Sequence, residues 1–202
     1  MSAGFIGRLI SMTEAERIRE TILEQAQPDV RARTAACTRK EKAFQIAAAD
    51  WYMRQIAAEE GLGEAGTIRV GHEKSGKPYL LSGEDRIDRH ISISHSSGYL
   101  YLCMADSPIG CDVEGVCRFP LNDGLKGFFS ENDLAAIRAS ERPEILLIRI
   151  WTRREAFAKL TGIMKGLRSR SFHDRETAQQ AYGVMFTEGQ EEGFLYTAAQ
   201  YS

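Results

Sequence analysis

The chain has 202 residues, 43% of them hydrophobic and 27% charged, and its formal net charge is −2. This composition is typical of a globular protein, and so small a charge gives no reason to expect nonspecific nucleic-acid binding. No apolar run approaches the roughly 20 residues that span a bilayer, and residues 1–13 lack the pattern of a secretory signal. We therefore expect a cytoplasmic protein with neither nucleic acid nor membrane as a partner.

The first half of the chain begins with helical patterns. A short strand is expected at residues 5–10. Two residue pairs have the spacing of a helix capping box, Thr13 with Glu16 and Thr38 with Glu41. The first pair predicts a helix that Pro28 ends at about residue 27, and the second predicts a longer helix that ends near residues 61–63.

The hydrophobic pattern then changes to a period of two, which is typical of strands. It predicts strands at residues 67–72, 90–95, 99–105 and 109–116. A turn is expected at residues 75–78, because glycine permits unusual backbone angles and the proline that follows restricts them.

Helical patterns return in the second half. Ser130 and Asp133 indicate the start of a helix at residues 131–139, and Pro143 suits the first position of another at residues 143–161. Strands are expected at residues 182–187 and 194–200. The order of elements thus repeats, which predicts an α+β pseudo-dimer of two similar halves, 1–106 and 107–202. Each half would pack a small sheet on a long helix, and the halves would be tightly packed as one unit.

The four cysteines give no sign of a metal site. Cys37, Cys103, Cys111 and Cys117 contain no C-x-x-C pair, so zinc has little support. We expect reduced thiols that pack as small apolar groups.

Two carboxylates share one face of a predicted strand. Asp112 and Glu114 are two residues apart, so their side chains leave the same side. Such closely spaced charges repel unless a cation neutralises them, and Mg²⁺ commonly takes one or two carboxylates together with phosphate oxygens. An isolated pair of this kind is more often a solvated strand face.

A third carboxylate lies on the long helix of the second half. Glu155 and Lys159 are four residues apart, on one stripe with Trp151. Glu155 could serve as a metal ligand or base, with Lys159 neutralising a phosphate. The alternative is an ordinary exposed ion pair, with Trp151 as a core anchor.

The first half offers further groups that suit phosphates. His95 ends an alternating strand next to Ser94, and Lys77 sits in the predicted turn. A Ser-His-Asp hydrolase is an alternative for His95, but the chain has no G-x-S-x-G motif. A basic run follows the first predicted helix: Arg31, Arg33, Arg39, Lys40 and Lys42. We expect most of these side chains on a solvated face, and one or two of them could bind a terminal phosphate.

Five short motifs in order resemble those of the 4′-phosphopantetheinyl transferases, specifically the two-halved Sfp-type. They are Gly76-Lys77-Pro78, Ser94-His95-Ser96, Gly110 to Glu114, Phe128-Phe129-Ser130 and Trp151 to Lys159. The resemblance extends from about residue 31 to residue 161. It departs from the family at Arg154, where a lysine is usual, and at residues 162–167, where the turn is longer.

The resemblance implies an activity as well as the pseudo-dimer fold. The family transfers the phosphopantetheine arm of coenzyme A to a serine of an apo acyl or peptidyl carrier protein, releasing adenosine 3′,5′-bisphosphate. It implies a Mg²⁺-dependent enzyme of the holo-[acyl-carrier-protein] synthase type that acts as a monomer. A carrier would dock near residues 121–129, and the sequence does not identify which carrier.

The resemblance also assigns roles by position. Asp112, Glu114 and Glu155 would hold Mg²⁺, and Glu155 would deprotonate the carrier serine. Lys159 would stabilise or protonate the leaving phosphate. Lys77, Ser94 and His95 would bind the phosphates of coenzyme A. Arg33 and, as a weaker match, Arg31 stand at the basic positions that bind its 3′-phosphate in the family. Two alternatives remain: a degenerate homologue that binds without turnover, and a hydrolase that removes the arm.

Overall fold

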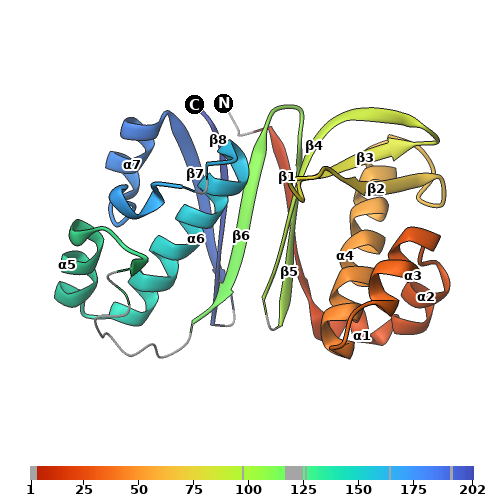
Figure 1. Ribbon diagram of the computed structural model, residues 1–202, viewed down its shortest axis with the longest axis horizontal. Helices are drawn as coiled ribbons and strands as arrows, with labels where there is room; N and C mark the ends of the chain where they lie inside the picture. The colour runs from red at the N-terminus through yellow and green to blue at the C-terminus, as the bar shows by residue number, and fades with distance from the viewer. Residues whose placement is uncertain (1–3, 97, 117–124, 126, 164, 192) are drawn as a thin grey trace. The chain divides into compact units, whose positions relative to one another are not determined.

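The computed structural model describes residues 4–96, 98–116, 125, 127–163, 165–191 and 193–202 (Figure 1). The chain folds into two compact units, Met1–Asp106 and Ser107–Ser202. Both combine helices with antiparallel sheet, which confirms the α+β class. Within the described ranges, no helix is long and apolar enough to cross a membrane. Cys117, Met164 and most of the predicted docking segment, residues 121–124 and 126, lie outside those ranges.

Unit 1 packs helices against one five-stranded sheet (Figure 1). The sheet order is β1-β5-β4-β3-β2, and every neighbouring pair is antiparallel. Its elements are β1 (Phe5–Ser11), α1 (Met12–Arg17), α2 (Arg19–Glu24), α3 (Pro28–Ala35), α4 (Lys40–Glu59), β2 (Ile68–His72), β3 (Pro78–Ser82), β4 (Asp85–Ser96) and β5 (Tyr99–Ala105).

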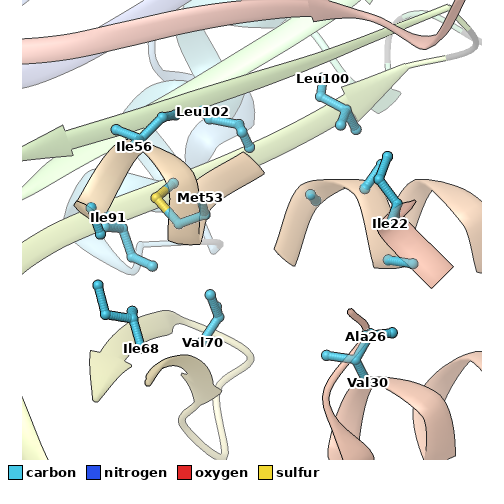
Figure 2. Close-up of a cluster of buried hydrophobic side chains, with 14 of the residues drawn as sticks. Ile22, Ala26, Val30, Met53, Ile56, Ile68, Val70, Ile91, Leu100 and Leu102 are labelled. Carbon is cyan, nitrogen blue, oxygen red and sulfur yellow. The ribbon is translucent and has the colours of Figure 1, made fainter. Parts of the chain in front are cut away.

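The core of unit 1 forms where the long helix α4 and the shorter helices cover the sheet. Figure 2 shows Met53 and Ile56 of α4 beside Ile91 and Leu102 of the sheet, all of them buried. Ile22 of α2, Val30 of α3 and Ala26 in the connection between these helices extend the same cluster. Burial of these apolar side chains is the main force that holds the helices on the sheet.

Both predicted capping boxes in unit 1 are wrong. Ser11 caps α1, its hydroxyl accepting a hydrogen bond from the Thr13 amide, and Glu16 instead forms an ion pair with Arg19. Helix α4 begins after Arg39 with no side-chain cap. The expected single helix over residues 13–27 is two short helices, α1 and α2.

The structure also corrects the interpretation of Pro28 as a helix breaker. Pro28 occupies the first turn of α3, a position where its missing amide hydrogen is not needed. The first two arginines of the basic run, Arg31 and Arg33, therefore lie on a helix that the sequence pattern did not indicate. Strand β3 was missed as well, because Pro78 follows the turn directly and begins the strand.

Unit 2 packs helices against a three-stranded antiparallel sheet, with the order β6-β8-β7 (Figure 1). Its elements are β6 (Ile109–Gly115), α5 (Glu131–Ala139), α6 (Pro143–Thr161), a 3₁₀ turn (Leu167–Ser169), α7 (Arg175–Tyr182), β7 (Val184–Glu191) and β8 (Phe194–Tyr201). The predicted bounds of α5 and α6 are confirmed, with Ser130 capping α5 and Gly162 ending α6 in the left-handed conformation. Helix α7 was missed, so β7 begins later than predicted.

Polar contacts fix α6 on this sheet. The Thr152 hydroxyl lies 2.8 Å from that of Thr197 on β8. The buried Arg153 guanidinium lies 2.7 Å from Glu188 of β7 and donates to the carbonyls of Phe172 and His173. These bonds set the position of the next turn of α6, which carries Glu155 and Lys159.

Candidate functional site

The site in unit 2 depends on a close approach between strand β6 and helix α6. Gly110, Asp112 and Glu114 alternate along β6 and share one face. A Cβ atom at Gly110 would overlap the backbone oxygen of Ala156 and the backbone nitrogen of Leu160. Only glycine allows this approach, which places Asp112 beside the last turns of α6.

Replacing Gly110 with alanine is expected to destabilise unit 2, because rigid helix backbone has to move to admit the methyl group. Overpacking of this kind costs about 1–3 kcal/mol. Gly127→Ala is the matched control, since nothing lies within 4 Å of a Cβ atom there. Urea denaturation of both variants checks the prediction, and equal unfolding midpoints for the two would contradict it.

Asp112 and Lys159 form the central contact of the site. The Lys159 ammonium lies 2.9 Å from Asp112 Oδ1 and 2.9 Å from the backbone oxygen of Cys111. Asp112 is buried and Lys159 is half-buried. Burial acts to lower the pKa of Lys159, but the Asp112 carboxylate and other nearby groups outweigh it, so that pKa is raised. Lys159 therefore keeps its charge at neutral pH.

Glu155 lies one helical turn before Lys159 and is half-buried. Burial, followed by the negative charge of Asp112, raises the pKa of the Glu155 carboxyl, while Lys159 and Arg154 partly offset the shift. Asp112 and Glu155 are thus close enough for their charges to interact. A carboxylate with a raised pKa is better matched to accepting a proton near neutral pH than an exposed one.

Glu114 is farther along β6, at the edge of an apolar pocket of about 290 Å³. The pocket is lined by Glu114, Gly115, Leu125, Phe128, Phe129, Leu147, Ile148 and Trp151. Trp151 lies one turn before Glu155 on α6, so the pocket adjoins the carboxylates. Phe128 is 54% exposed, whereas Phe129 is buried against Trp151.

The predicted metal ligands are not assembled as a ligand set. Across the ranges that the structure describes, no group of three histidine, cysteine or carboxylate side chains is placed to hold a metal ion. One oxygen of Asp112 instead accepts from Lys159. The chemistry of the donors nevertheless fits Mg²⁺, because two interacting carboxylates carry negative charge that a hard cation would neutralise.

Arg154, which stands where the family usually has lysine, is buried rather than exposed to a ligand. Its guanidinium carbon lies 5.3 Å from the centre of the Phe129 ring. Burial lowers its pKa, and the charges of Asp133 and Glu155 oppose that shift. The arginine therefore packs α6 against the segment that precedes α5.

In unit 1, three of the predicted phosphate-binding residues lie on strand β4 and in a turn, and the other two, Arg31 and Arg33, lie on helix α3. Ser94 is buried on β4 opposite Tyr101, and His95 follows it, exposed, opposite Leu100. Lys77 closes the hairpin between β2 and β3, where its carbonyl accepts from the Glu73 amide at 2.9 Å.

The two arginines of α3 have different surroundings. The Arg31 guanidinium donates to the carbonyls of Ala26 and Glu24, at 2.8 and 2.7 Å, so it holds the end of α2 in place. Arg33 Nη1 lies 3.3 Å from His72 Nδ1 at the end of β2. Sequence reasoning missed His72, which belongs to none of the five motifs and lies 39 residues from Arg33.

The comparisons with known proteins agree with the motifs. The sequence model of the 4′-phosphopantetheinyl transferase superfamily matches residues 108–200. The 4′-phosphopantetheinyl transferase Sfp of Bacillus subtilis strain 168 is 27% identical over 165 residues, which cover 81% of this chain and 69% of the relative. Another B. subtilis 4′-phosphopantetheinyl transferase is 29% identical over 161 residues, 78% of this chain and 70% of its own length.

The matched stretch contains the whole Asp112, Glu155 and Lys159 cluster, and the two relatives extend the likeness into unit 1. The order of the five motifs, the α+β fold and these similarities agree, and they confirm the resemblance of this chain to the Sfp-type group of the 4′-phosphopantetheinyl transferase superfamily.

Proposed function

We propose that this protein transfers the 4′-phosphopantetheine arm of coenzyme A to a serine of an apo acyl or peptidyl carrier protein. The reaction is that of a holo-[acyl-carrier-protein] synthase and releases adenosine 3′,5′-bisphosphate. The supporting observation is the cluster of Asp112, Glu155 and Lys159 within the stretch that resembles the superfamily. We also propose that the two units are similar in fold, that the protein acts as a monomer and that it is located in the cytoplasm.

The residues of unit 2 suit the parts of a phosphoryl transfer. The serine oxygen forms a bond to the phosphorus next to the pantetheine, and the bond from that phosphorus to the bridging oxygen breaks. Glu155 takes the serine proton, which its raised pKa favours. Lys159 faces the oxygen that leaves; because its own pKa is raised, it stabilises the new negative charge rather than donating a proton.

Mg²⁺ completes the proposal, with Asp112, Glu114 and Glu155 as its protein ligands. When bound, the ion would neutralise pyrophosphate charge, which is the main requirement of phosphoryl transfer. The interaction of Asp112 with Glu155 supports this assignment, because a cation removes the repulsion between them.

Unit 1 supplies the proposed contacts with the phosphates of coenzyme A: Lys77, Ser94, His95 and Arg33. Arg31 is a weaker candidate, because two backbone carbonyls already accept from its guanidinium. We keep Arg31 in the proposal because the third nitrogen of its guanidinium, Nη1, would donate a hydrogen bond to a phosphate oxygen.

The test is mass spectrometry of apo carrier proteins incubated with the enzyme, coenzyme A and Mg²⁺. A panel of fatty-acid, polyketide and peptide carriers is used, each with a matched carrier in which the acceptor serine is alanine. We expect the mass of phosphopantetheine to be added only to carriers that keep the serine. The panel also identifies the preferred carrier.

Two outcomes would contradict the proposal. Binding of coenzyme A in calorimetry with no added mass on any carrier would indicate a binding protein without turnover. Release of free phosphopantetheine from holo carrier would indicate a hydrolase. Comparing the reaction with coenzyme A and with acetyl-coenzyme A then determines whether acylated substrate is accepted.

A further inference from the structure

Two basic side chains from different elements of unit 1 meet at the surface. Arg33 of α3 and His72 at the end of β2 are both exposed, with Arg33 Nη1 3.3 Å from His72 Nδ1. Arg33 is always protonated, so it donates this bond and His72 accepts it in the neutral form. If His72 became protonated, two positive charges would stand next to each other unless an anion were present.

Among the described residues, no carboxylate forms an ion pair with Arg33 or His72. Glu73, next to His72 in the chain, lies 3.0 Å from Arg86 and also accepts from the Ser75 hydroxyl. Asp29, one helical turn before Arg33, raises the pKa of His72 but forms no ion pair with either residue among the described parts of the chain. Asp50 of α4 also interacts with the charge of Arg33, but it is buried and paired with Arg54 at 2.8 Å. The exposed pair therefore has positive charge available for a ligand.

We propose that His72 joins Arg33 in binding a phosphate monoester in its dianionic form, with the protonated imidazole donating a second charged hydrogen bond to the phosphate. Guanidinium and imidazolium groups both donate strongly to phosphate oxygens. This inference rests on the proposed function, because coenzyme A carries one phosphate monoester, the 3′-phosphate of its ribose. His72 thereby becomes a specificity residue that distinguishes coenzyme A from dephospho-coenzyme A.

The site has a predictable pH dependence. In the ligand-free protein, burial and then the Arg33 charge lower the pKa of His72, while Asp29 raises it. A bound dianion favours the protonated ring, so its pKa rises on binding and the protein takes up a proton. Affinity should therefore fall as the pH rises through the pKa of His72 in the complex.

Titration calorimetry compares the affinities for adenosine 3′,5′-bisphosphate and adenosine 5′-monophosphate, and the difference measures the contribution of the 3′-phosphate. We expect the wild type to prefer the bisphosphate more strongly at pH 6.5 than at pH 8.5. His72→Gln should reduce this preference about tenfold at pH 6.5 and change it little at pH 8.5. Titrations in two buffers of different ionisation enthalpy should show proton uptake in the wild type that His72→Gln lacks.

His90→Gln is the matched control, because His90 lies half-buried on β4, opposite Tyr79 and Ala105. Equal preference for the bisphosphate in the wild type and His72→Gln would overturn the inference, as would an effect on melting temperature alone. These titrations need no carrier protein, so they remain interpretable if transfer fails. Conversely, an active enzyme whose preference for the bisphosphate is unchanged in His72→Gln would contradict the inference and leave the proposed function intact.

Discussion

Asp112→Asn is expected to reduce phosphopantetheine transfer at least about 10²-fold, a magnitude typical for the loss of one charged group that stabilises a transition state. Asparagine keeps the size of the side chain and an oxygen that can accept from Lys159, which lies 2.9 Å from Asp112 Oδ1. What it removes is the negative charge that holds the Lys159 ammonium and that the proposed cation requires. Asp112→Ala should abolish transfer, because the ligand atom is lost as well.

The experiment compares initial rates of carrier modification by mass spectrometry with melting temperatures of the same preparations. Asp174→Asn is the matched control, since Asp174 caps α7 from an exposed position and asparagine caps helices equally well. A folded Asp112→Asn protein with a wild-type rate would exclude Asp112 from the site. Loss of folded protein is separated from loss of activity by the melting data.

The elements that could be predicted from sequence are those with strong local signals. Strand β5 and helices α5 and α6 match their predicted bounds, because alternating or helical hydrophobic patterns coincide with clear start and stop residues such as Ser130 and Gly162. The errors concern short elements. Pro28 fits both a helix end and a helix start, and only the packing of Val30 into the core shows which applies.

The candidate site was predictable as a set of residue types but not as an arrangement. Spacing alone puts Asp112 and Glu114 on one strand face and Glu155 and Lys159 on one helix stripe. The contact between Asp112 and Lys159 joins residues 47 positions apart, and it depends on Gly110 admitting the helix. The Arg33 and His72 contact is likewise tertiary, so no local pattern could indicate it.

Helix α6 combines stability and function in consecutive residues. Thr152 and Arg153 face the sheet and are fully bonded there, whereas Glu155 is held in a half-buried position next to another carboxylate. The bonds of Thr152 and Arg153 therefore hold the next turn of α6 in place, although the position of Glu155 beside another carboxylate is unfavourable. Such a distribution is expected where a charged group has to be poised for reaction, and it predicts that removing the charge should help folding while harming activity.

Glu155→Gln is the variant that tests this trade-off, and we expect it to lower transfer by about 10²–10⁴-fold because the proposed base is lost. Its stability should change in the opposite direction. The pKa of Glu155 is higher in the folded protein than its ordinary value of 4.5, so between these two pKa values the native state binds more protons than the unfolded state. The wild type therefore loses stability as the pH rises through that interval, and glutamine, which does not ionise, avoids the loss.

Thermal unfolding of both proteins in the presence of a chelator, from pH 4 to pH 8, measures the difference. The melting temperature of Glu155→Gln should exceed that of the wild type at neutral pH, and the gap should close as the pH falls below the usual pKa of glutamate. Glu141→Gln, an exposed change before α6, is the control and should show no such pH-dependent gap. Adding Mg²⁺ should then raise the melting temperature of the wild type more than that of Glu155→Gln, because only the wild type has the second carboxylate beside Asp112. A Glu155→Gln protein that is less stable than the wild type at neutral pH would show that the carboxylate is bound by favourable contacts, and Glu155 would then be a structural residue rather than a base.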